Sequence, residues 1–231
     1  MARKSDLVSV IIPMFNSRRF IQDAIRSVRL QSYSPIEIIV IDDGSTDGSV
    51  NLIRSIEGIR YSYQNHSGVA SARNMGISKA SGSFIAFLDA DDLWDKEKID
   101  MQIRLFNKDH ELDCLFCRLE NFFDPNSQLP SWLDPAHFSA EKFKSMKSLS
   151  TMIVRTEVYE RVGLFDTKYR SGEDIEWFTR LKDTGIRTFF MPEVLVSRRL
   201  HDSNLSYQKN FKQKDLLKVL KASIDRNRPK D

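Results

Sequence analysis

The sequence predicts an α/β protein with one mostly parallel central sheet and helices on both of its faces. Over roughly the first ninety residues, short β-branched segments alternate with segments of helical periodicity. Such alternation is typical of βαβ units and a parallel sheet. The segment 36–41 (IEIIVI) is apolar except for Glu37, as expected for a strand that is covered on both faces. Asp residues follow two of the predicted strands, and in open α/β sheets ligands bind outside the carboxyl ends of the strands.

The elements of the first half are expected in a regular order. Apolar and β-branched runs predict strands at residues 7–12, 36–41, 59–64 and 83–88. Apolar or small residues at helical spacing predict helices at 20–28, near 50–53, and at 69–80. We expect Pro13 to end the first strand and Asn16 or Ser17 to cap the helix after it.

The second half predicts longer and less regular elements. Helices are expected at 96–110, 156–161 and 172–185, and extended segments at 112–123, 149–154 and 188–200. Residues 124–147 contain three prolines and predict a long loop, which at this length is usually functional or mobile. From Phe211 onward a basic helix is expected, with one apolar side made of Leu216, Leu217, Leu220 and Ile224.

Composition places the chain among soluble globular proteins. It has 231 residues, of which 41 % are hydrophobic and 29 % are charged, so it can bury a full core and shows no signature of disorder. No apolar run approaches the roughly 18–20 residues that span a bilayer. Residues 1–6 lead directly into a predicted strand without a secretory leader. We therefore expect a cytoplasmic protein without a transmembrane segment.

The net charge of +3 is unevenly distributed along the chain. Residues 198–231 hold ten Lys or Arg against four Asp or Glu, so the remainder is mildly acidic. Such a tail suits an anionic partner or a solvated helix face. We expect it to cover the sheet and to contribute to a homodimer contact. Peripheral contact with anionic lipid at the inner face of the membrane is the alternative. Nucleic acid is not an expected partner.

The two cysteines, Cys114 and Cys117, form a single C-x-x-C pair. A zinc site would need two further soft ligands at suitable spacing, and none is apparent. The pair lies within a predicted strand, whereas a redox pair would lie in a turn before a helix. We expect buried free thiols, consistent with a reducing compartment.

Three carboxylates, Asp89, Asp91 and Asp92, stand directly after the predicted strand at 83–88. Like charges at this separation raise one another's pKa, so a compensating positive group is expected. A hard divalent cation with oxygen ligands is one candidate. A solvated acidic turn in which Asp92 caps the next helix is the other, and these residues alone leave both open.

Five motifs stand in order along the chain. They are VSVIIPMFN at 8–16, DDGSTD at 42–47, ARNMG at 72–76, DADD at 89–92 and GED at 172–174. In this order and at these separations, the sequence resembles the family 2 glycosyltransferases of the GT-A fold from about Leu7 to Ser206. The resemblance implies a single GT-A (Rossmann-like) domain at 1–206, with a nucleotide-binding half at 1–92 and an acceptor-side half at 93–206. Residues 207–231 then form a basic C-terminal helical tail.

The resemblance also implies a site for a nucleotide-sugar donor, with a UDP-sugar as the leading candidate. Asp43 would hydrogen-bond the uracil and ribose, Phe15 would pack against the base, and Arg73 would approach the base or the diphosphate. Pro13 and Ala90 are expected to line the same site. On local chemistry alone, the alternative for Asp43 is a helix cap, and the alternative for Arg73 is a salt bridge on the helix surface. No residue distinguishes UDP from GDP or dTDP.

A Mn²⁺ or Mg²⁺ ion is the cofactor that the resemblance implies. Asp91 would bind it between the two phosphates, and Asp89 would contact the ribose or the metal. His201 would approach the diphosphate or the metal, and the alternative is a surface histidine in the basic tail. The ion is needed because a nucleoside diphosphate leaves poorly until its developing charge is neutralised. Asp92 is expected to cap a helix or to support the ligands.

Glu173 and Asp174 follow Gly172 and open a predicted helix, where acidic side chains are favoured by the helix dipole. The resemblance makes Asp174 the general base that removes the proton of the acceptor hydroxyl, with inversion in a single displacement. Glu173 is the second candidate for this role. Without the other motifs, both would be interpreted as ordinary first-turn acids.

The predicted function is therefore an inverting, metal-dependent glycosyltransferase (hexosyltransferase) with a D-x-D motif at 89–91. A nucleotidyltransferase is one alternative, although the chain has no glycine-rich phosphate loop followed by lysine near its first strand. A non-catalytic nucleotide-sugar-binding protein is the other alternative. The acceptor stays open among a glycan, a lipid-linked molecule, a peptide and a small molecule.

Overall fold

The structure is a computed structural model that describes residues 7–127, 147–169, 171–202, 204 and 213–226, the last of these without side chains at 213–217. Its elements, in chain order, are β1 (Val8–Met14), α1 (Ile21–Arg29), β2 (Ile36–Asp42), α2 (Ser49–Arg54), β3 (Ile59–Tyr63), α3 (Val69–Lys79), β4 (Phe84–Phe87), β5 (Leu93–Trp94), α4 (Lys98–Lys108), β6 (Cys114–Phe123), the 3₁₀ turn η1 (Leu149–Thr151), β7 (Ile153–Arg155), α7 (Val158–Val162), α8 (Glu173–Asp183), β8 (Thr188–Leu200) and α9 (Gln213–Arg226).

Within the described residues, eight strands form one sheet in the order β3-β2-β1-β4-β7-β6-β8-β5. The four strands of the first half are all parallel to one another, as their alternation with helices predicts. The second half adds β7 antiparallel to β4 and β6, and pairs β6 parallel with β8. The sheet is therefore mixed, and its purely parallel part is the nucleotide-binding half of the sequence prediction.

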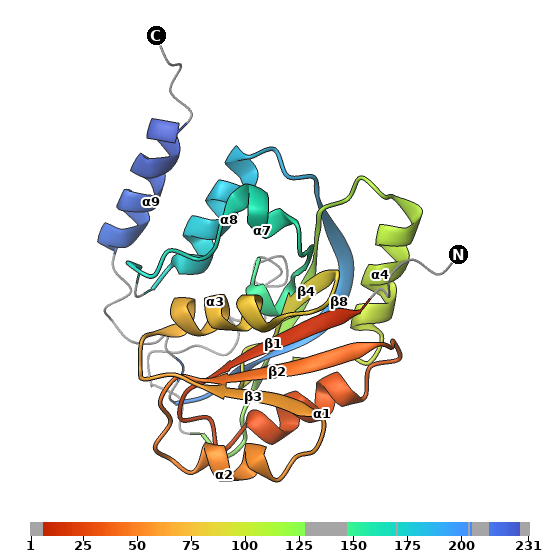
Figure 1. The fold of residues 1–231 in the computed structure, drawn as a ribbon, viewed down its shortest axis with the longest axis vertical. Coiled ribbons are helices and arrows are strands. Elements are labelled where there is room, and N and C mark those ends of the chain that lie inside the picture. Colours follow the sequence, from red (N-terminus) through yellow and green to blue (C-terminus); the bar gives the residue numbers. More distant parts are fainter. Residues whose placement is uncertain (1–6, 128–146, 170, 203, 205–212, 227–231) are drawn as a thin grey trace.

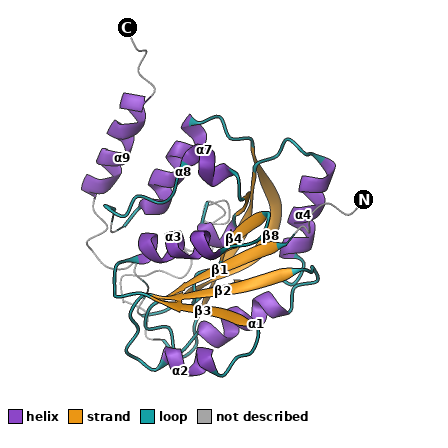
Figure 2. Ribbon diagram, in the orientation of Figure 1, coloured by secondary structure: helices purple, strands orange, loops and turns teal. Residues whose placement is uncertain are grey.

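Helices cover both faces of this sheet (Figures 1 and 2). Alternate residues of β2 belong to two separate cores: Ile38 and Val40 pack with α1 and α4, while Ile39 and Ile41 pack with α3, α7 and α8. The apolar run of β2 is thus explained by burial on both faces. Trp177 of α8 is fully buried in the second core.

Helix α3 lies unusually close to the sheet because of Gly76. A Cβ atom on Gly76 would overlap the Ile11 side chain of β1, so only glycine permits this approach. The same helix carries Arg73, which is buried at 5 % exposure. Gly76 therefore allows α3 to pack closely on the sheet, and Arg73, one turn earlier in the same helix, is buried.

Several local expectations are corrected by the structure. Pro13 lies inside β1, which continues to Met14. Pro13 pairs with Ile41 of β2, but its nitrogen faces β4, which pairs with β1 only as far as Ile11. The missing amide proton is therefore tolerated, because β4 has already ended at this position. Neither Asn16 nor Ser17 is the cap of α1, whose cap position is Phe20, although the Ser17 carbonyl accepts the first helical amides.

The segment at 149–154, predicted as one strand, is the turn η1 followed by the short strand β7. Most of the predicted loop at 124–147 lies outside the described residues. Cys114 and Cys117 are free and buried, as predicted.

Helix α9 packs against α8 through a side that the sequence did not predict. Val219 is buried, whereas Leu220 and Ile224 are 50 % and 63 % exposed. Polar contacts explain the orientation, since Ser223 donates to Asp183 at 3.1 Å and Arg226 Nε lies 2.9 Å from the same carboxylate. The side chains of Leu216 and Leu217 lie outside the described part of the helix.

Among the residues that the structure describes, no helix has both the length and the hydropathy needed to cross a bilayer.

Candidate active site

The predicted site residues of the first half gather at the carboxyl edge of the parallel strands. Direct hydrogen bonds join the loops there: the Asp43 amide donates to the Met14 carbonyl at 2.8 Å, and the Asn16 amide donates to Ser45 Oγ at 2.9 Å. Parallel strands present their carboxyl ends on one side, which is why the loops after β1 and β2 meet although 29 residues separate Asn16 from Ser45.

Asp43 organises the turn that follows β3. Its Oδ1 accepts from Gln64 Nε2 and from the Ser67 amide, both at 2.7 Å, and its Oδ2 accepts from the Gly68 amide at 3.0 Å. His66 Nδ1 lies 3.0 Å from the same Oδ2 and from the Asp43 carbonyl, so this nitrogen must carry the proton. Four donors of the chain thus surround the Asp43 carboxylate. A base or ribose that hydrogen-bonds to it would have to displace one of these donors or bind an oxygen that already accepts from one.

Phe15 and His66 form an exposed aromatic pair above this turn. Their ring centroids are 4.2 Å apart with planes inclined by 26°, and Phe15 is 45 % exposed. An exposed aromatic face at the end of β1 suits the predicted packing against a nucleobase. Pro13, two residues earlier, is buried within the strand and supports the loop from below.

Arg73 is a buried bridge between the two halves of the chain. Its Nη1 donates to Glu173 Oε1 at 2.5 Å, and its Nη2 donates to Asp89 Oδ1 at 3.1 Å. Its guanidinium carbon lies 5.8 Å from the centre of the Phe165 ring. The guanidinium group is therefore committed to two carboxylates, and the alternative of an exposed surface salt bridge is wrong because Arg73 is buried.

The three carboxylates after β4 have three different surroundings. Asp89 faces Arg73, and burial raises its pKa although the nearby guanidinium opposes the shift. Asp92 is buried at 4 % exposure and accepts hydrogen bonds from Ser150 Oγ at 2.9 Å and from the Arg199 amide at 3.2 Å. Burial, with Asp91 adding to it, raises the pKa of Asp92 well above its ordinary value. Asp92 is not a helix cap, because α4 begins only at Lys98.

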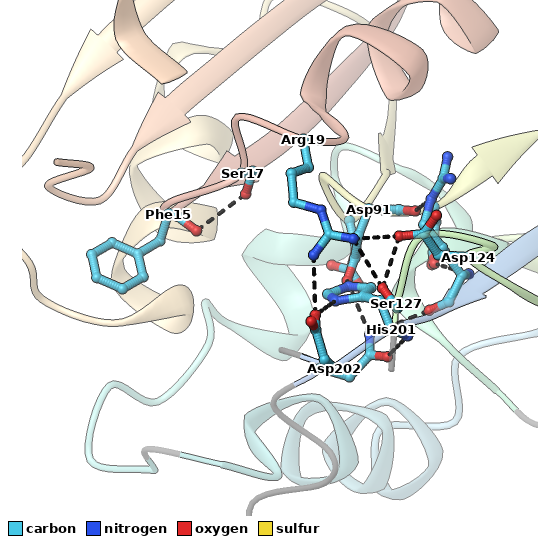
Figure 3. Close-up of polar contacts among 12 residues, drawn as sticks. Phe15, Ser17, Arg19, Asp91, Asp124, Ser127, His201 and Asp202 are labelled. Atoms are coloured by element: carbon cyan, nitrogen blue, oxygen red, sulfur yellow. Dashed lines mark hydrogen bonds and ion pairs between the residues drawn. The ribbon is translucent and has the colours of Figure 1, made fainter. Parts of the chain in front are cut away.

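Asp91 points to the end of β8, where it meets His201. The distance from Asp91 Oδ2 to His201 Nε2 is 2.9 Å (Figure 3). This is a hydrogen-bond distance, and a metal ion bound by both groups would take the place of the shared proton. Adjacent ligand atoms on an octahedral ion with bonds of about 2.1 Å are also separated by about 3 Å, so the two side chains are near enough to bind one ion. A carboxylate oxygen with an imidazole nitrogen suits Mn²⁺ better than Mg²⁺, which prefers oxygen ligands.

The predicted set of Asp91, Asp89 and His201 is not brought together as three ligands. Within the described residues, no three Asp, Glu, His or Cys side chains are placed to hold a metal ion jointly. The Asp89 carboxylate forms an ion pair with Arg73 instead. Further coordination positions would be left to phosphate oxygens and water, as is common for Mg²⁺ and Mn²⁺ in nucleotide sites. Ala90, between the two Asp residues, is buried at 7 % exposure.

Asp174 lies in the first turn of α8, after Gly172 in the left-handed region with φ 78°. Its Oδ1 accepts from the Ile175 amide at 2.8 Å, and no cationic side chain of the described residues forms an ion pair with it. Glu173 beside it is 6 % exposed and held by Arg73. Burial raises the pKa of Asp174, and the negative charge of Glu173 adds to the effect. Of the two predicted bases, Glu173 is ion-paired with Arg73, whereas Asp174 is not.

Arg199 of β8 holds the loop that carries Asp91, and the sequence did not single it out as a site residue. Its guanidinium carbon lies 5.0 Å from the Phe20 ring centre and 4.8 Å from that of Phe122, and its Nε donates to the Asp91 carbonyl at 3.1 Å. A cation between two aromatic rings is stabilised by both. In the sequence, the only sign of this role was that Arg199 lies two residues before His201.

Arg19 is a second residue that the sequence missed. In Figure 3 its guanidinium group lies between Asp124, Ser127 and Asp202, with distances of 2.6, 2.9 and 3.1 Å to these side chains. It thereby joins the loop after β1 to the ends of β6 and β8. No local pattern marks this role, since its partners lie more than 100 residues away.

Comparison with known proteins identifies the family of this chain. The family model described as "Glycosyl transferase family 2" matches residues 9–164. An uncharacterized glycosyltransferase of Rickettsia typhi is 34 % identical over 211 residues, which cover 86 % of this chain and 65 % of that protein. The chain therefore spans slightly less than two thirds of that relative's length.

Two solved structures share the fold. S. aureus TarS 1-349 in complex with UDP-GlcNAc has a TM-score of 0.77 at 20 % sequence identity, covering 97 % of this chain and 68 % of the TarS chain. The mannosyltransferase PcManGT from Pyrobaculum calidifontis, in complex with GDP-Man and Mn²⁺, has a TM-score of 0.65 at 20 % identity, covering 87 % of this chain and 58 % of the other. At these identities the likeness concerns the fold alone.

Proposed function

This chain belongs to glycosyl transferase family 2, and from that premise we propose that it transfers a sugar from a nucleotide-sugar to an acceptor hydroxyl with inversion. One observation carries the proposal. At the carboxyl edge of the sheet, the Asp91 carboxylate and the His201 imidazole lie 2.9 Å apart, and Arg73 forms an ion pair with Glu173 but not with Asp174.

The donor is proposed to be a UDP-sugar. Residues 1–92 would bind its nucleotide, with the base against Phe15 and beside the turn that Asp43 holds. Residues 93–206 would bind the acceptor. The UDP-GlcNAc complex of TarS and the GDP-Man complex of the mannosyltransferase support a nucleotide-sugar donor. Because the second complex holds a GDP-sugar, a donor test should compare UDP-sugars with GDP-sugars.

The metal is proposed to be Mn²⁺, with Mg²⁺ as the alternative, held by Asp91 and His201. When bound, such an ion neutralises the charge that develops on the nucleoside diphosphate as it leaves. The Mn²⁺ in the mannosyltransferase complex supports this choice. Asp89 is proposed to act without touching the metal. Its ion pair with Arg73, which also binds Glu173, connects the loop at 89–92 to the start of α8.

Asp174 is proposed to take the proton of the acceptor hydroxyl at Oδ2. Its other oxygen is fixed by the Ile175 amide, which orients the carboxylate. The raised pKa of Asp174 makes it a stronger base than an exposed aspartate, and general bases of suitable pKa contribute about 10²–10⁴-fold to rates. Arg73, which is ion-paired with Glu173, offsets part of the repulsion between the two adjacent carboxylates.

Incubation with UDP-sugars, GDP-sugars and Mn²⁺, followed by assay of nucleoside diphosphate release, tests this function. Metal-dependent release of UDP, increased by an acceptor, is expected. Pyrophosphate exchange with UTP would instead identify a nucleotidyltransferase, and donor binding without any turnover would identify a non-catalytic binding protein. A donor-saturated screen of glycans, lipid-linked sugars, peptides and small molecules then identifies the acceptor.

A further inference from the structure

Asn204 lies just beyond β8, in contact with both members of the Asp91–His201 pair. Its Oδ1 accepts from the His201 amide at 2.6 Å, and its Nδ2 lies 3.2 Å from Asp91 Oδ2 and 3.2 Å from the Arg199 carbonyl. The residue is 7 % exposed, so these contacts are shielded from water. A buried amide with all of these partners is held in one orientation.

The orientation of this amide follows from the chemistry of its neighbours. The His201 backbone N–H can only donate, so the oxygen of Asn204 must face it. The Asp91 carboxylate and the Arg199 carbonyl can only accept, so the nitrogen of Asn204 must face them. The reverse orientation would set donor against donor and leave two acceptors facing an oxygen. Asn204 therefore donates to Asp91.

This donation fixes one side of the Asp91 carboxylate. Oδ2 is contacted by Asn204 Nδ2 at 3.2 Å and by His201 Nε2 at 2.9 Å. The bond from the His201 amide to Asn204 simultaneously fixes the backbone from which the imidazole projects. The imidazole itself packs against Phe20, with ring centroids 4.4 Å apart. One side chain thus sets the relative position of the carboxylate and the imidazole.

We propose that Asn204 is a positioning residue for the Mn²⁺ site formed by Asp91 and His201. This inference rests on the proposed metal-dependent function. Groups that hydrogen-bond to metal ligands fix their orientation, and their loss typically weakens metal binding by about 10–100-fold. Asn204 contacts both proposed ligands at once, and its Nδ2 also donates to the Arg199 carbonyl.

The test is Mn²⁺ binding in the presence of UDP, measured by the loss of the free Mn²⁺ signal in electron paramagnetic resonance. Asn204→Ala is expected to raise the Kd for Mn²⁺ by about 10–100-fold. In the transfer assay it raises the Mn²⁺ concentration for half-maximal rate, while kcat at saturating Mn²⁺ is retained. If Asn204→Ala does not fold, Asn204→Ser replaces it, because a serine hydroxyl is too short to reach both His201 and Asp91.

Asn74→Ala is the matched control. Asn74 also makes two hydrogen bonds to distant backbone, with Nδ2 donating to the Phe165 carbonyl at 2.8 Å and Oδ1 accepting from the Phe165 amide at 2.9 Å. Its loss is expected to lower thermal stability to a similar extent and to leave the Kd for Mn²⁺ unchanged.

The outcomes separate this inference from the proposed function. If the wild-type protein with UDP binds no Mn²⁺, the proposed metal-dependent function fails. If the wild type binds Mn²⁺ and Asn204→Ala binds it equally tightly, Asn204 has only a structural role and the inference is overturned. Weakened Mn²⁺ binding in Asn204→Ala, with normal binding in Asn74→Ala, supports the positioning role.

Discussion

Replacing Arg73 by methionine removes the bridge between the two halves of the site. Arg73 is 5 % exposed and makes ion pairs with Glu173 at 2.5 Å and with Asp89 at 3.1 Å. Methionine keeps much of the side-chain volume and loses the charge, so the two carboxylates stay in place without their common partner. The main effect is thus electrostatic, with little cavity formation.

The expected loss of unfolding free energy follows from this burial. Removing one partner of a buried ion pair costs about 3–5 kcal/mol, because the remaining charge is left desolvated. For a chain of this size, each kcal/mol lowers Tm by about 2–4 °C. The Tm of Arg73→Met is therefore expected to fall by about 6–20 °C.

Acidification should reduce this deficit. In the wild type, burial raises the pKa of Asp89, and Arg73 limits the rise. Without Arg73 the pKa of folded Asp89 rises further above that of the unfolded chain, so the folded variant binds a proton more readily. A group with a raised folded pKa contributes stability at low pH and loses it as pH rises. The deficit is therefore largest at neutral pH and shrinks as pH falls towards about 4.

Urea unfolding followed by circular dichroism at several pH values measures this effect. Arg104→Met is the control, because Arg104 is 72 % exposed and pairs with Asp100 one helical turn away. Such exposed pairs contribute only about 0.3–0.5 kcal/mol. The reasoning is refuted if Arg73→Met costs no more than Arg104→Met, or if its deficit grows on acidification.

Three further predictions concern catalysis, the metal and the thiols. Asp174→Asn should lower kcat by about 10²–10⁴-fold and leave UDP affinity unchanged by calorimetry; normal transfer would remove Asp174 as the base. Asp91→Ala should abolish the Mn²⁺ dependence of UDP binding, and retention of that dependence would exclude Asp91 as a ligand. Cys114 and Cys117 should react with a thiol reagent only after unfolding, since both are buried and burial raises the pKa of Cys117 to about 11; rapid reaction of the native protein would contradict this.

Much of the fold was predictable because its signals are local. The nearly continuous apolar run at 36–41 predicted a strand buried on both faces, and β2 is divided between two cores. The glycine at 172 predicted the start of a helix, and α8 begins at Glu173. The turn at 13–16 and the acidic clusters at 42–43 and 89–92 predicted a site at the strand ends, because parallel strands place such residues on one edge.

The errors arise where distant residues decide local structure. Pro13 stays within β1 because its neighbour β4 has already ended. Helix α9 turns Leu220 and Ile224 outward because Asp183 of α8 binds Ser223 and Arg226. Neither partner can be inferred from the segment itself.

The sequence by itself determined the α/β class, the parallel first half and the acidic residues at its edge, because periodicity and residue type act within a few positions. Only the tertiary structure decided how those acids divide their roles. In the folded chain, Asp89 and Glu173 both form ion pairs with Arg73. Asp92 is buried and accepts a hydrogen bond from Ser150. Asp91 contacts His201 and Asn204. These pairings depend on which charged groups share a buried space, and that is fixed by packing between elements up to 113 residues apart.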